Sequence, residues 1–205
     1  RWRKKQARGD MIIVRYADDF VVGFQHQADA EQFRCDLEVR LRRFALELHP
    51  DKTRLIRFGR FAAQQRRERG EGKPETFDFL GFTHVCSHGR TGDYYVLRRL
   101  TVAKRMNARL RAVKRELMRR RHEPIPDQGK WLGSVVRGYL GYHAVPLNTQ
   151  RMERFRQEVV RHWRRALSRR SQKDRPTWVR MNRLAKRFIP PARVQHPWPQ
   201  KRLRV

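Results

Sequence analysis

The sequence predicts an α+β protein in which antiparallel strands and one helix come first and a basic α-helical region follows. Near the start, two short apolar runs flank a pair of aspartates, which is the pattern of a hairpin. Beyond Leu100 the apolar residues recur every three or four positions, as in amphipathic helices. The charge changes at the same place: residues 1–97 hold 19 lysines and arginines against 14 acidic residues, and residues 98–205 hold 31 against 6. We therefore predict two domains, 1–97 and 98–205, the second ending in a proline-rich tail.

The net charge of +30 makes nucleic acid the expected partner. A generally basic protein without a polyanionic ligand is the alternative. A membrane surface fits less well, because the basic helices lack a strongly apolar opposite face. No apolar run is long enough to span a bilayer and no signal peptide is visible. The two cysteines, Cys35 and Cys86, give no disulfide framework and favour a reducing, cytoplasmic location.

The first element is predicted as a hairpin of residues 11–14 and 20–24, with Asp18 and Asp19 at its tip. A purely structural turn more often carries Asn-Gly or Asp-Gly, whereas two adjacent aspartates repel each other. Their carboxylates are hard oxygen ligands suited to Mg²⁺, so a cation is expected there. A solvated acidic turn is an equally weighted alternative on these letters alone.

The rest of the N-terminal half is predicted from periodicity and turn residues. A helix over 28–48 would begin with a capping box of Asp29 and Gln32. A strand over 52–59, an exposed loop over 60–75, a strand over 76–85, a turn over 87–93 and a strand over 94–100 follow.

The C-terminal half is predicted as a series of amphipathic helices. The first buries Met106, Leu110, Val113 and Leu117 and ends before Pro124 and Pro126. The second spans 131–145, where three glycines would allow close packing. Asn148 would cap the third, whose apolar stripe is Met152, Phe155, Val159, Trp163 and Ala166, and Pro176 would open a short fourth. The four prolines after Phe188 predict an irregular tail.

The segments "RYADDFVVGF", "HPDKTRLIRFG" and "FDFLGF", in this order, resemble the palm of reverse transcriptases. "GYLGYHAV" and "PPARVQHPWP" resemble the thumb and tail of the maturase region, domain X, of group II intron-encoded reverse transcriptases. The resemblance covers nearly the whole chain. It implies the C-terminal part of a right-hand polymerase palm followed by an α-helical thumb and maturase bundle.

The resemblance also implies roles for individual residues. Asp18 would bind the metals with Asp19 in support, using two Mg²⁺ ions in the complete enzyme. Tyr16 and Ala17 would lie near the primer terminus and the incoming deoxynucleoside triphosphate. Lys52 would lie near the nucleotide phosphates, with a surface lysine beside Asp51 as the alternative. The primer grip would be Phe79, Leu80, Gly81 and Phe82, whose alternative is plain sheet core.

The basic helices would form a thumb that holds the RNA template and DNA primer by shape and phosphate contacts, and would also bind intron RNA. The first choices for these contacts are Lys104, Arg105, Arg109, Arg111, Lys114 and Arg115, and the second are Arg161, Arg164, Arg165, Arg169 and Arg170. For any single one, a solvated helix face is the alternative. Trp131, Tyr139, Tyr142 and Trp163 carry aromatic rings that could stack on bases, but their helical spacing favours core positions.

The predicted function is therefore that of an RNA-directed DNA polymerase and intron maturase. Because the family also needs an aspartate from an earlier palm strand, and Arg1 opens the chain, we expect a fragment without polymerase activity of its own. A non-catalytic RNA-binding splicing factor is one alternative, against which the intact Asp18 and Asp19 argue mildly. A retron-type reverse transcriptase is another, and the maturase-like segment argues against it.

Overall fold

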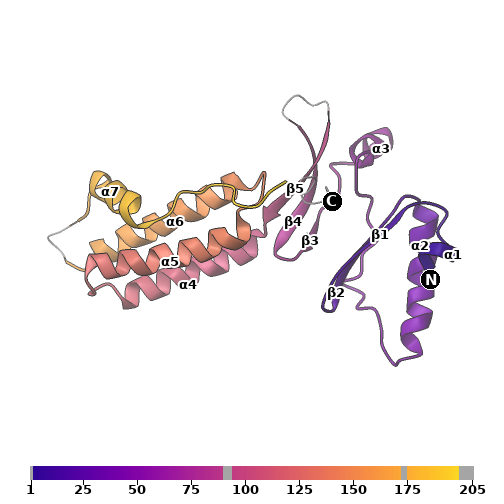
Figure 1. Cartoon of the computed structure of the whole chain (residues 1–205), viewed down its shortest axis with the longest axis horizontal. Coiled ribbons are helices and arrows are strands. Elements are labelled where there is room, and N and C mark those ends of the chain that lie inside the picture. The colour runs from indigo at the N-terminus through magenta and orange to yellow at the C-terminus, as the bar shows by residue number, and fades with distance from the viewer. Residues whose placement is uncertain (1, 90–93, 172–174, 199–205) are drawn as a thin grey trace. The chain divides into compact units, whose positions relative to one another are not determined.

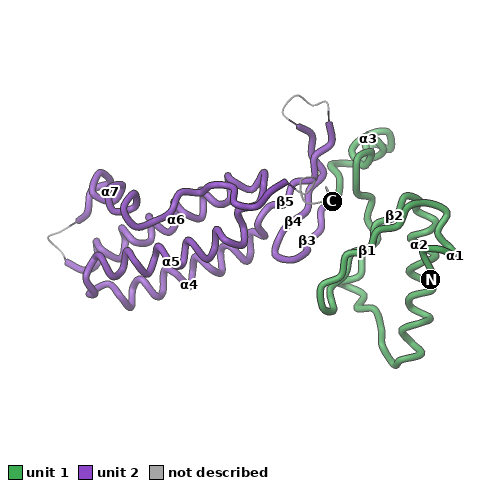
Figure 2. The backbone as a smooth tube through the Cα atoms, in the orientation of Figure 1, with its two compact units in different colours: residues 1–75 green, residues 76–205 purple. Residues whose placement is uncertain are grey.

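The computed structural model describes residues 2–89, 94–171 and 175–198. These residues form helices and two small antiparallel sheets, which confirms the predicted α+β class. The chain folds as two compact units, 1–75 and 76–205 (Figure 2). The predicted division after residue 97 separates palm from thumb by function, and it stays a prediction. No helix among the described residues is long and apolar enough to cross a membrane.

The N-terminal unit is a hairpin packed on a helix (Figure 1). Its elements are α1 (Trp2–Lys5), β1 (Met11–Tyr16), β2 (Asp19–Phe24), α2 (Gln27–Arg42) and α3 (Ala62–Glu68). The predicted hairpin is confirmed: the strands are antiparallel and Tyr16 lies opposite Asp19. The rings of Trp2, Phe24 and Phe33 join α1, β2 and α2, with ring centroids 5.1 to 6.0 Å apart.

The start of α2 differs from the predicted capping box. The helix begins at Gln27 after His26, whose side chain makes no capping hydrogen bond. Asp29 lies instead in the first turn, buried, where its Oδ2 accepts hydrogen bonds from the backbone N–H groups of Arg8 and Gly9 at 2.8 and 3.2 Å. The carboxylate therefore holds the chain that enters β1, a contact between distant residues that local spacing does not encode.

Three predictions for this unit, one helix end, one strand and one loop, differ from the structure. The helix ends at Arg42 rather than at 48, and Ala45 turns the chain with a φ of 54°. The strand over 52–59 does not form, because an extended segment needs a neighbouring strand and the described sheet of this unit holds β1 and β2 alone. The loop over 60–75 contains α3, whose sequence AAQQRRE consists of good helix formers.

The C-terminal unit places a three-stranded sheet at one end of a helical bundle (Figure 1). The strands β3 (Phe77–Phe79), β4 (Phe82–His88) and β5 (Tyr95–Thr101) pair in sequence order. The single strand predicted over 76–85 is thus wrong, because the chain reverses at Leu80 and Gly81. The strand over 94–100 is confirmed as β5, and part of the turn over 87–93 lies outside the described residues.

The helices of this unit are α4 (Ala103–Arg119), α5 (Ile125–His143), α6 (Thr149–Ser168) and α7 (Trp178–Phe188). The predicted stripes of α4 and α6 are buried in one core, and all described residues after α7 are irregular, as predicted. The first helix ends at Arg119, before Pro124 and Pro126 as predicted, and the two prolines begin α5, because proline is tolerated in a first turn. The buried Trp163 Nε1 donates to Gln128 Oε1 at 3.0 Å, which ties α6 to α5.

Asn148 joins the sheet to the bundle. It occupies the predicted N-cap position of α6, but its side chain makes no capping bond. Its Oδ1 accepts from the Thr101 N–H at 3.1 Å, and its Nδ2 donates to Thr101 Oγ1 at 2.8 Å and to the His143 carbonyl at 2.9 Å. The buried amide therefore fixes the end of β5 against the end of α5.

Candidate active site and nucleic-acid interface

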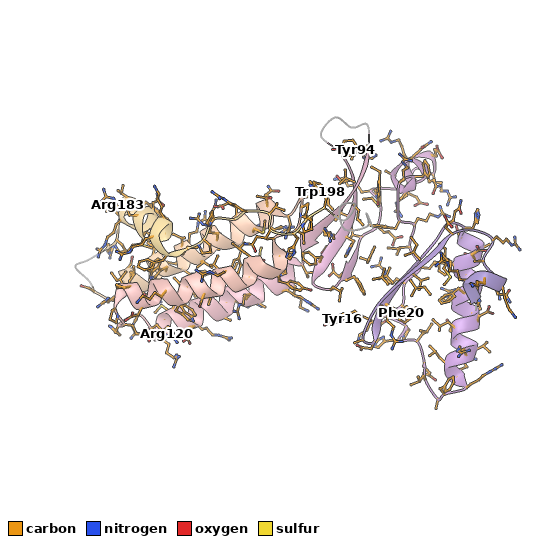
Figure 3. The ribbon with its side chains drawn as sticks, in the orientation of Figure 1. Tyr16, Phe20, Tyr94, Arg120, Arg183 and Trp198 are labelled. Atoms are coloured by element: carbon orange, nitrogen blue, oxygen red, sulfur yellow. The ribbon has the colours of Figure 1, made fainter. Side chains whose placement is uncertain are left out.

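The paired acids lie at the exposed end of the β1–β2 hairpin. Tyr16 and Asp19 form the last pair of the ladder, so Ala17 and Asp18 make the two-residue turn. Ala17 has a φ of 53°, and the Arg15 Nε donates to its carbonyl at 2.8 Å, which holds this left-handed residue in place. Figure 3 shows Tyr16 and Phe20 at this end of the hairpin. The structure thus brings Tyr16, Ala17, Asp18 and Asp19 together in one turn.

One face of this hairpin is apolar and open to solvent. Residues directly opposite in an antiparallel pair share a face, so Ile12, Val14, Tyr16 and Asp19 lie on the same side. The other face carries Met11, which is buried, Phe24, which contacts α2 through Phe33, and the exposed Ile13 and Phe20. Tyr16 is 65% exposed, so its ring is available to a ligand beside Asp19.

The donor set at this turn is incomplete for a two-ion site. Two carboxylates supply hard oxygen ligands for Mg²⁺, which takes about six in octahedral geometry. Across the described ranges, no group of three or more His, Cys, Asp or Glu residues could hold a metal ion. Asp18 and Asp19 therefore fit part of a magnesium site and need further donors to complete one.

Lys52 lies in a turn that follows α2, and its side chain is exposed. Its backbone N–H donates to the His49 carbonyl at 3.2 Å. Within the described part of the chain its ammonium group forms no ion pair, so the charge is free for a phosphate.

The "FLGF" segment forms the tight turn between β3 and β4. Phe79 pairs with Phe82, and both turn residues have positive φ, 48° at Leu80 and 77° at Gly81. This is the backbone of a type I′ turn, in which a leucine is unusual because its Cβ crowds the backbone. Phe82 is buried and Phe79 half-buried, so the turn is anchored through its flanking aromatic residues.

Two residues that the sequence did not assign to this turn lie beside it, and Tyr142 holds it. The Tyr142 hydroxyl donates to the Leu80 carbonyl at 2.7 Å, and the Tyr142 ring stacks on Phe82 with centroids 5.6 Å apart. An Arg105 guanidinium nitrogen lies 3.3 Å from where a Cβ on Gly81 would be. The "GYLGY" spacing signalled a helix, but nothing in it showed that Tyr142, 53% exposed, would face a turn 62 residues earlier.

His143 lies beside the same turn and is held neutral. Burial, with a smaller contribution from the Arg105 charge, lowers the pKa of His143 to about 4. Its ring contacts Phe82 and Tyr139 at centroid distances of 5.3 and 4.4 Å. At neutral pH the imidazole therefore packs as a neutral ring against Phe82, the residue that follows the turn.

The six cations chosen first for phosphate contacts are all exposed on α4: Lys104, Arg105, Arg109, Arg111, Lys114 and Arg115. Lys104, Arg111 and Arg115 share one helix face because seven and four residues separate them. No ion pair between any of the six and a described acidic residue is present, whereas the neighbouring Arg119 and Arg120 pair with Glu116. The α4 surface thus presents uncompensated positive charge.

The second set is partly engaged within the protein. Arg161 pairs with Glu158, and Arg170 donates to the Glu123 carbonyl at 3.3 Å. Arg164 is half-buried, and its Nε donates to the Pro176 carbonyl at 3.1 Å. Arg165 and Arg169 remain exposed. Among the aromatic candidates, Tyr139 and Trp163 are core residues as predicted, while Trp131 is half-buried beneath the Arg120 guanidinium.

Comparison with known proteins identifies the segment that carries the acids. Residues 1–84 match the family model of the reverse transcriptase (RNA-dependent DNA polymerase). This match supports the predicted reverse transcriptase and, with it, nucleic-acid template and primer and nucleotide substrates. The search of curated proteins found no match to the chain.

The matched segment includes the residues predicted to be catalytic. It spans the Tyr16–Asp19 turn and Lys52 in the N-terminal unit, and it continues through Phe79–Phe82 at the start of the C-terminal unit. The α4 and α6 cations lie beyond it. Their assignment to nucleic acid therefore depends on their exposure and charge.

Proposed function

We propose that the protein is the C-terminal part of a group II intron-encoded reverse transcriptase and maturase, which extends a DNA primer on an RNA template and binds intron RNA. The observation that carries the proposal is the reverse transcriptase match over residues 1–84, with Asp18 and Asp19 at an exposed turn inside it. The maturase-like segments after residue 100 extend the proposal to the helical bundle.

In this proposal Asp18 and Asp19 contribute two ligands to the magnesium ions of nucleotidyl transfer. The described residues offer no third acidic, histidine or cysteine ligand near them. Two carboxylates from one turn bind Mg²⁺ weakly, because the ion keeps most of its water. The 205-residue chain alone is therefore expected not to polymerise.

The chain's remaining residues would position substrates. Tyr16 and Ala17 lie beside the acids and would contact the primer end and the nucleotide, whose phosphates Lys52 would neutralise. The Leu80–Gly81 turn would support the primer strand. Its positive φ values, its anchor to Tyr142 and its neighbour Arg105 give it a fixed shape with a cation at its side.

The α4 cations would hold the template–primer duplex. An RNA–DNA hybrid is recognised by its backbone, so exposed arginines without base contacts suffice. Lys104, Arg111 and Arg115 share a face and lack protein partners among the described residues, which makes them the sharpest test set.

The test measures binding of a poly(rA)·oligo(dT) hybrid across a range of salt concentrations. Replacing Lys104, Arg111 and Arg115 together by alanine should reduce the slope of log affinity against log salt by about 2, since each phosphate contact contributes about 0.7 to 0.9. The matched control removes three exposed arginines from the N-terminal unit, Arg34, Arg40 and Arg43. An equal change in both variants would show that net charge, and not the α4 face, determines binding.

A primer-extension assay with the same hybrid tests the catalytic part. We expect no template-dependent synthesis by the 205 residues, and synthesis would contradict the proposed incompleteness of the metal site. The incomplete donor set also favours a second candidate, a non-catalytic splicing factor. That protein would bind structured intron RNA far more tightly than a hybrid of equal charge, whereas a polymerase thumb would bind both.

A further inference from the structure

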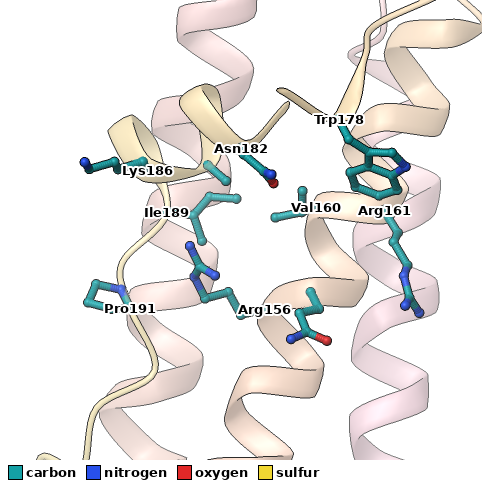
Figure 4. A pocket seen from close by; sticks show the side chains of 10 residues that line it. Arg156, Val160, Arg161, Trp178, Asn182, Lys186, Ile189 and Pro191 are labelled. Atoms are coloured by element: carbon teal, nitrogen blue, oxygen red, sulfur yellow. The ribbon is translucent and has the colours of Figure 1, made fainter. Parts of the chain in front are cut away.

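The C-terminal unit contains a groove that the functional assignment above does not use. It encloses about 580 Å³ between α6, α7 and the chain that follows α7 (Figure 4). Its floor is apolar and buried, formed by Val160 of α6, Ala185 of α7 and Ile189. The volume lies in the range of small-molecule sites, about 300 to 1,000 Å³.

One wall of the groove is an exposed aromatic ring with a fixed orientation. Trp178 begins α7 and is 46% exposed. The Arg164 guanidinium lies over its ring, 4.7 Å from the centroid, and is itself held by the Pro176 carbonyl. Arg164 does not line the groove, so the part of the indole that lines it is not the part that Arg164 covers. That exposed part of the ring is left to a ligand.

The remaining lining is polar and cationic. Figure 4 shows Asn182 projecting from α7 toward Val160, between Trp178 and Ile189. An amide offers both a donor and an acceptor for the edge of a base. The lining also includes Arg156, Arg161 and Lys186. Arg156 and Arg161 pair with Glu153 and Glu158, while Lys186 has no ion pair among the residues described.

We infer that this groove binds one unpaired nucleotide of an RNA strand. The base stacks on the open face of Trp178 and meets the Asn182 amide, the apolar floor excludes water beneath it, and the phosphate lies toward Lys186. A planar wall, an amide and cations match a nucleotide in each of its parts. An acidic peptide would use the cations but would gain little from a flat indole. The inference rests on the proposed function only in that the protein binds RNA.

The experiment uses the full chain and a 12-nucleotide oligo(U) RNA in a fluorescence-anisotropy titration. Trp178→Ala should weaken binding about tenfold, as expected for the loss of one base stack. The affinity of Trp178→Phe, which keeps a flat ring, should lie between those of the unchanged protein and Trp178→Ala. The affinity of Trp178→Leu should equal that of Trp178→Ala. Asn182→Ala should weaken binding a few-fold. Trp198→Ala removes another exposed tryptophan that does not line the groove, and it should leave affinity within twofold.

Two matched comparisons test the contributions of Lys186 and of the nucleotide base to binding. Lys186→Ala should weaken binding more than Arg183→Ala, since Arg183 is exposed on the same helix but lies outside the groove. With an abasic 12-mer, Trp178→Ala and the unchanged protein should bind alike, because no base is present to stack.

Other results would contradict the groove assignment, the identity of its ligand or the proposed function. If the protein binds oligo(U) tightly and Trp178→Ala changes the affinity by less than twofold, the groove is not the nucleotide site. The same follows if Trp178→Ala weakens binding of the abasic strand as much as binding of oligo(U). Either result overturns the groove assignment and leaves the proposed function standing. Binding of a polyglutamate peptide that depends on Trp178 assigns the groove to an acidic protein partner and overturns the nucleotide. A chain that binds neither oligo(U) nor the RNA–DNA hybrid overturns the proposed function itself.

Discussion

Two glycines of α5, five residues apart, should respond differently to replacement by alanine. A Cβ added to Gly133 would lie 2.5 Å from the backbone oxygen of Phe188, the last residue of α7. A Cβ added to Gly138 would meet nothing within 4 Å. Both positions are helical, so Ala gains about 1 kcal/mol over Gly at each from helix propensity.

The clash at Gly133 decides the difference. A carbonyl oxygen of a packed helix cannot rotate away as a flexible side chain can, so α7 must shift relative to α5. Overpacking of this kind costs about 1 to 3 kcal/mol, or more where backbone must move. Gly138→Ala should therefore stabilise the protein by about 1 kcal/mol. The free energy of unfolding of Gly133→Ala should be about 1 to 3 kcal/mol lower than that of Gly138→Ala, because both variants share the gain in helix propensity and only Gly133→Ala has the clash.

Urea denaturation followed by circular dichroism at 222 nm measures both variants, with the slope m required to stay constant. Gly133→Ala as stable as Gly138→Ala would refute the close approach of α7 to α5. It would also remove the fixed position of α7 on which the nucleotide groove depends.

Three further changes test other parts of the fold. Asn148→Ala removes three hydrogen bonds inside the C-terminal unit and should lower the free energy of unfolding by about 3 kcal/mol. The control is Asn107→Ala, at an exposed position of α4, which should change the free energy of unfolding by less than about 0.5 kcal/mol. The lowered pKa of His143 predicts that its contribution to stability is complete above about pH 6.5 and declines as the pH falls toward 4, because the unfolded chain then binds the extra proton. In urea titrations, His143→Gln should lose less stability between pH 7 and pH 4.5 than the unchanged protein. An equal loss in both proteins would contradict the assignment. Asp29→Ala leaves the N–H groups of Arg8 and Gly9 unsatisfied and should destabilise the N-terminal unit by about 2 kcal/mol, whereas Asp29→Asn, which keeps an acceptor, should cost less in the same assay.

The strongest local patterns were sufficient to predict several elements. Apolar residues at helical spacing placed the buried faces of α4 and α6, because a helix that packs on one side repeats its contacts every three or four residues. The two apolar runs around Asp18 and Asp19 gave the hairpin and its turn. The three glycines expected to allow close packing in the second helix show the limit: Gly133 meets α7, but Gly138 and Gly141 face open space.

Several of the errors arose where a distant contact overrides a local preference. Leu80 adopts a left-handed conformation that its residue type disfavours, and the Tyr142 hydroxyl that meets its carbonyl lies 62 residues away in sequence. Asp29 and Asn148 have the composition of helix caps, yet their side chains bond to segments far along the chain. No window of sequence contains both partners of such a bond.

The sequence by itself determined the class of the fold, the uneven distribution of charge and the adjacent acids Asp18 and Asp19, because composition, periodicity and neighbouring residues carry those properties. Only the tertiary structure decided that Tyr142 and Arg105 flank the Leu80–Gly81 turn, that the α4 cations are free while several on α6 are engaged, and that Trp178 and Asn182 line one groove with an apolar floor. Each of these depends on which helix faces which, and burial of the apolar stripes fixes that choice for the whole bundle at once.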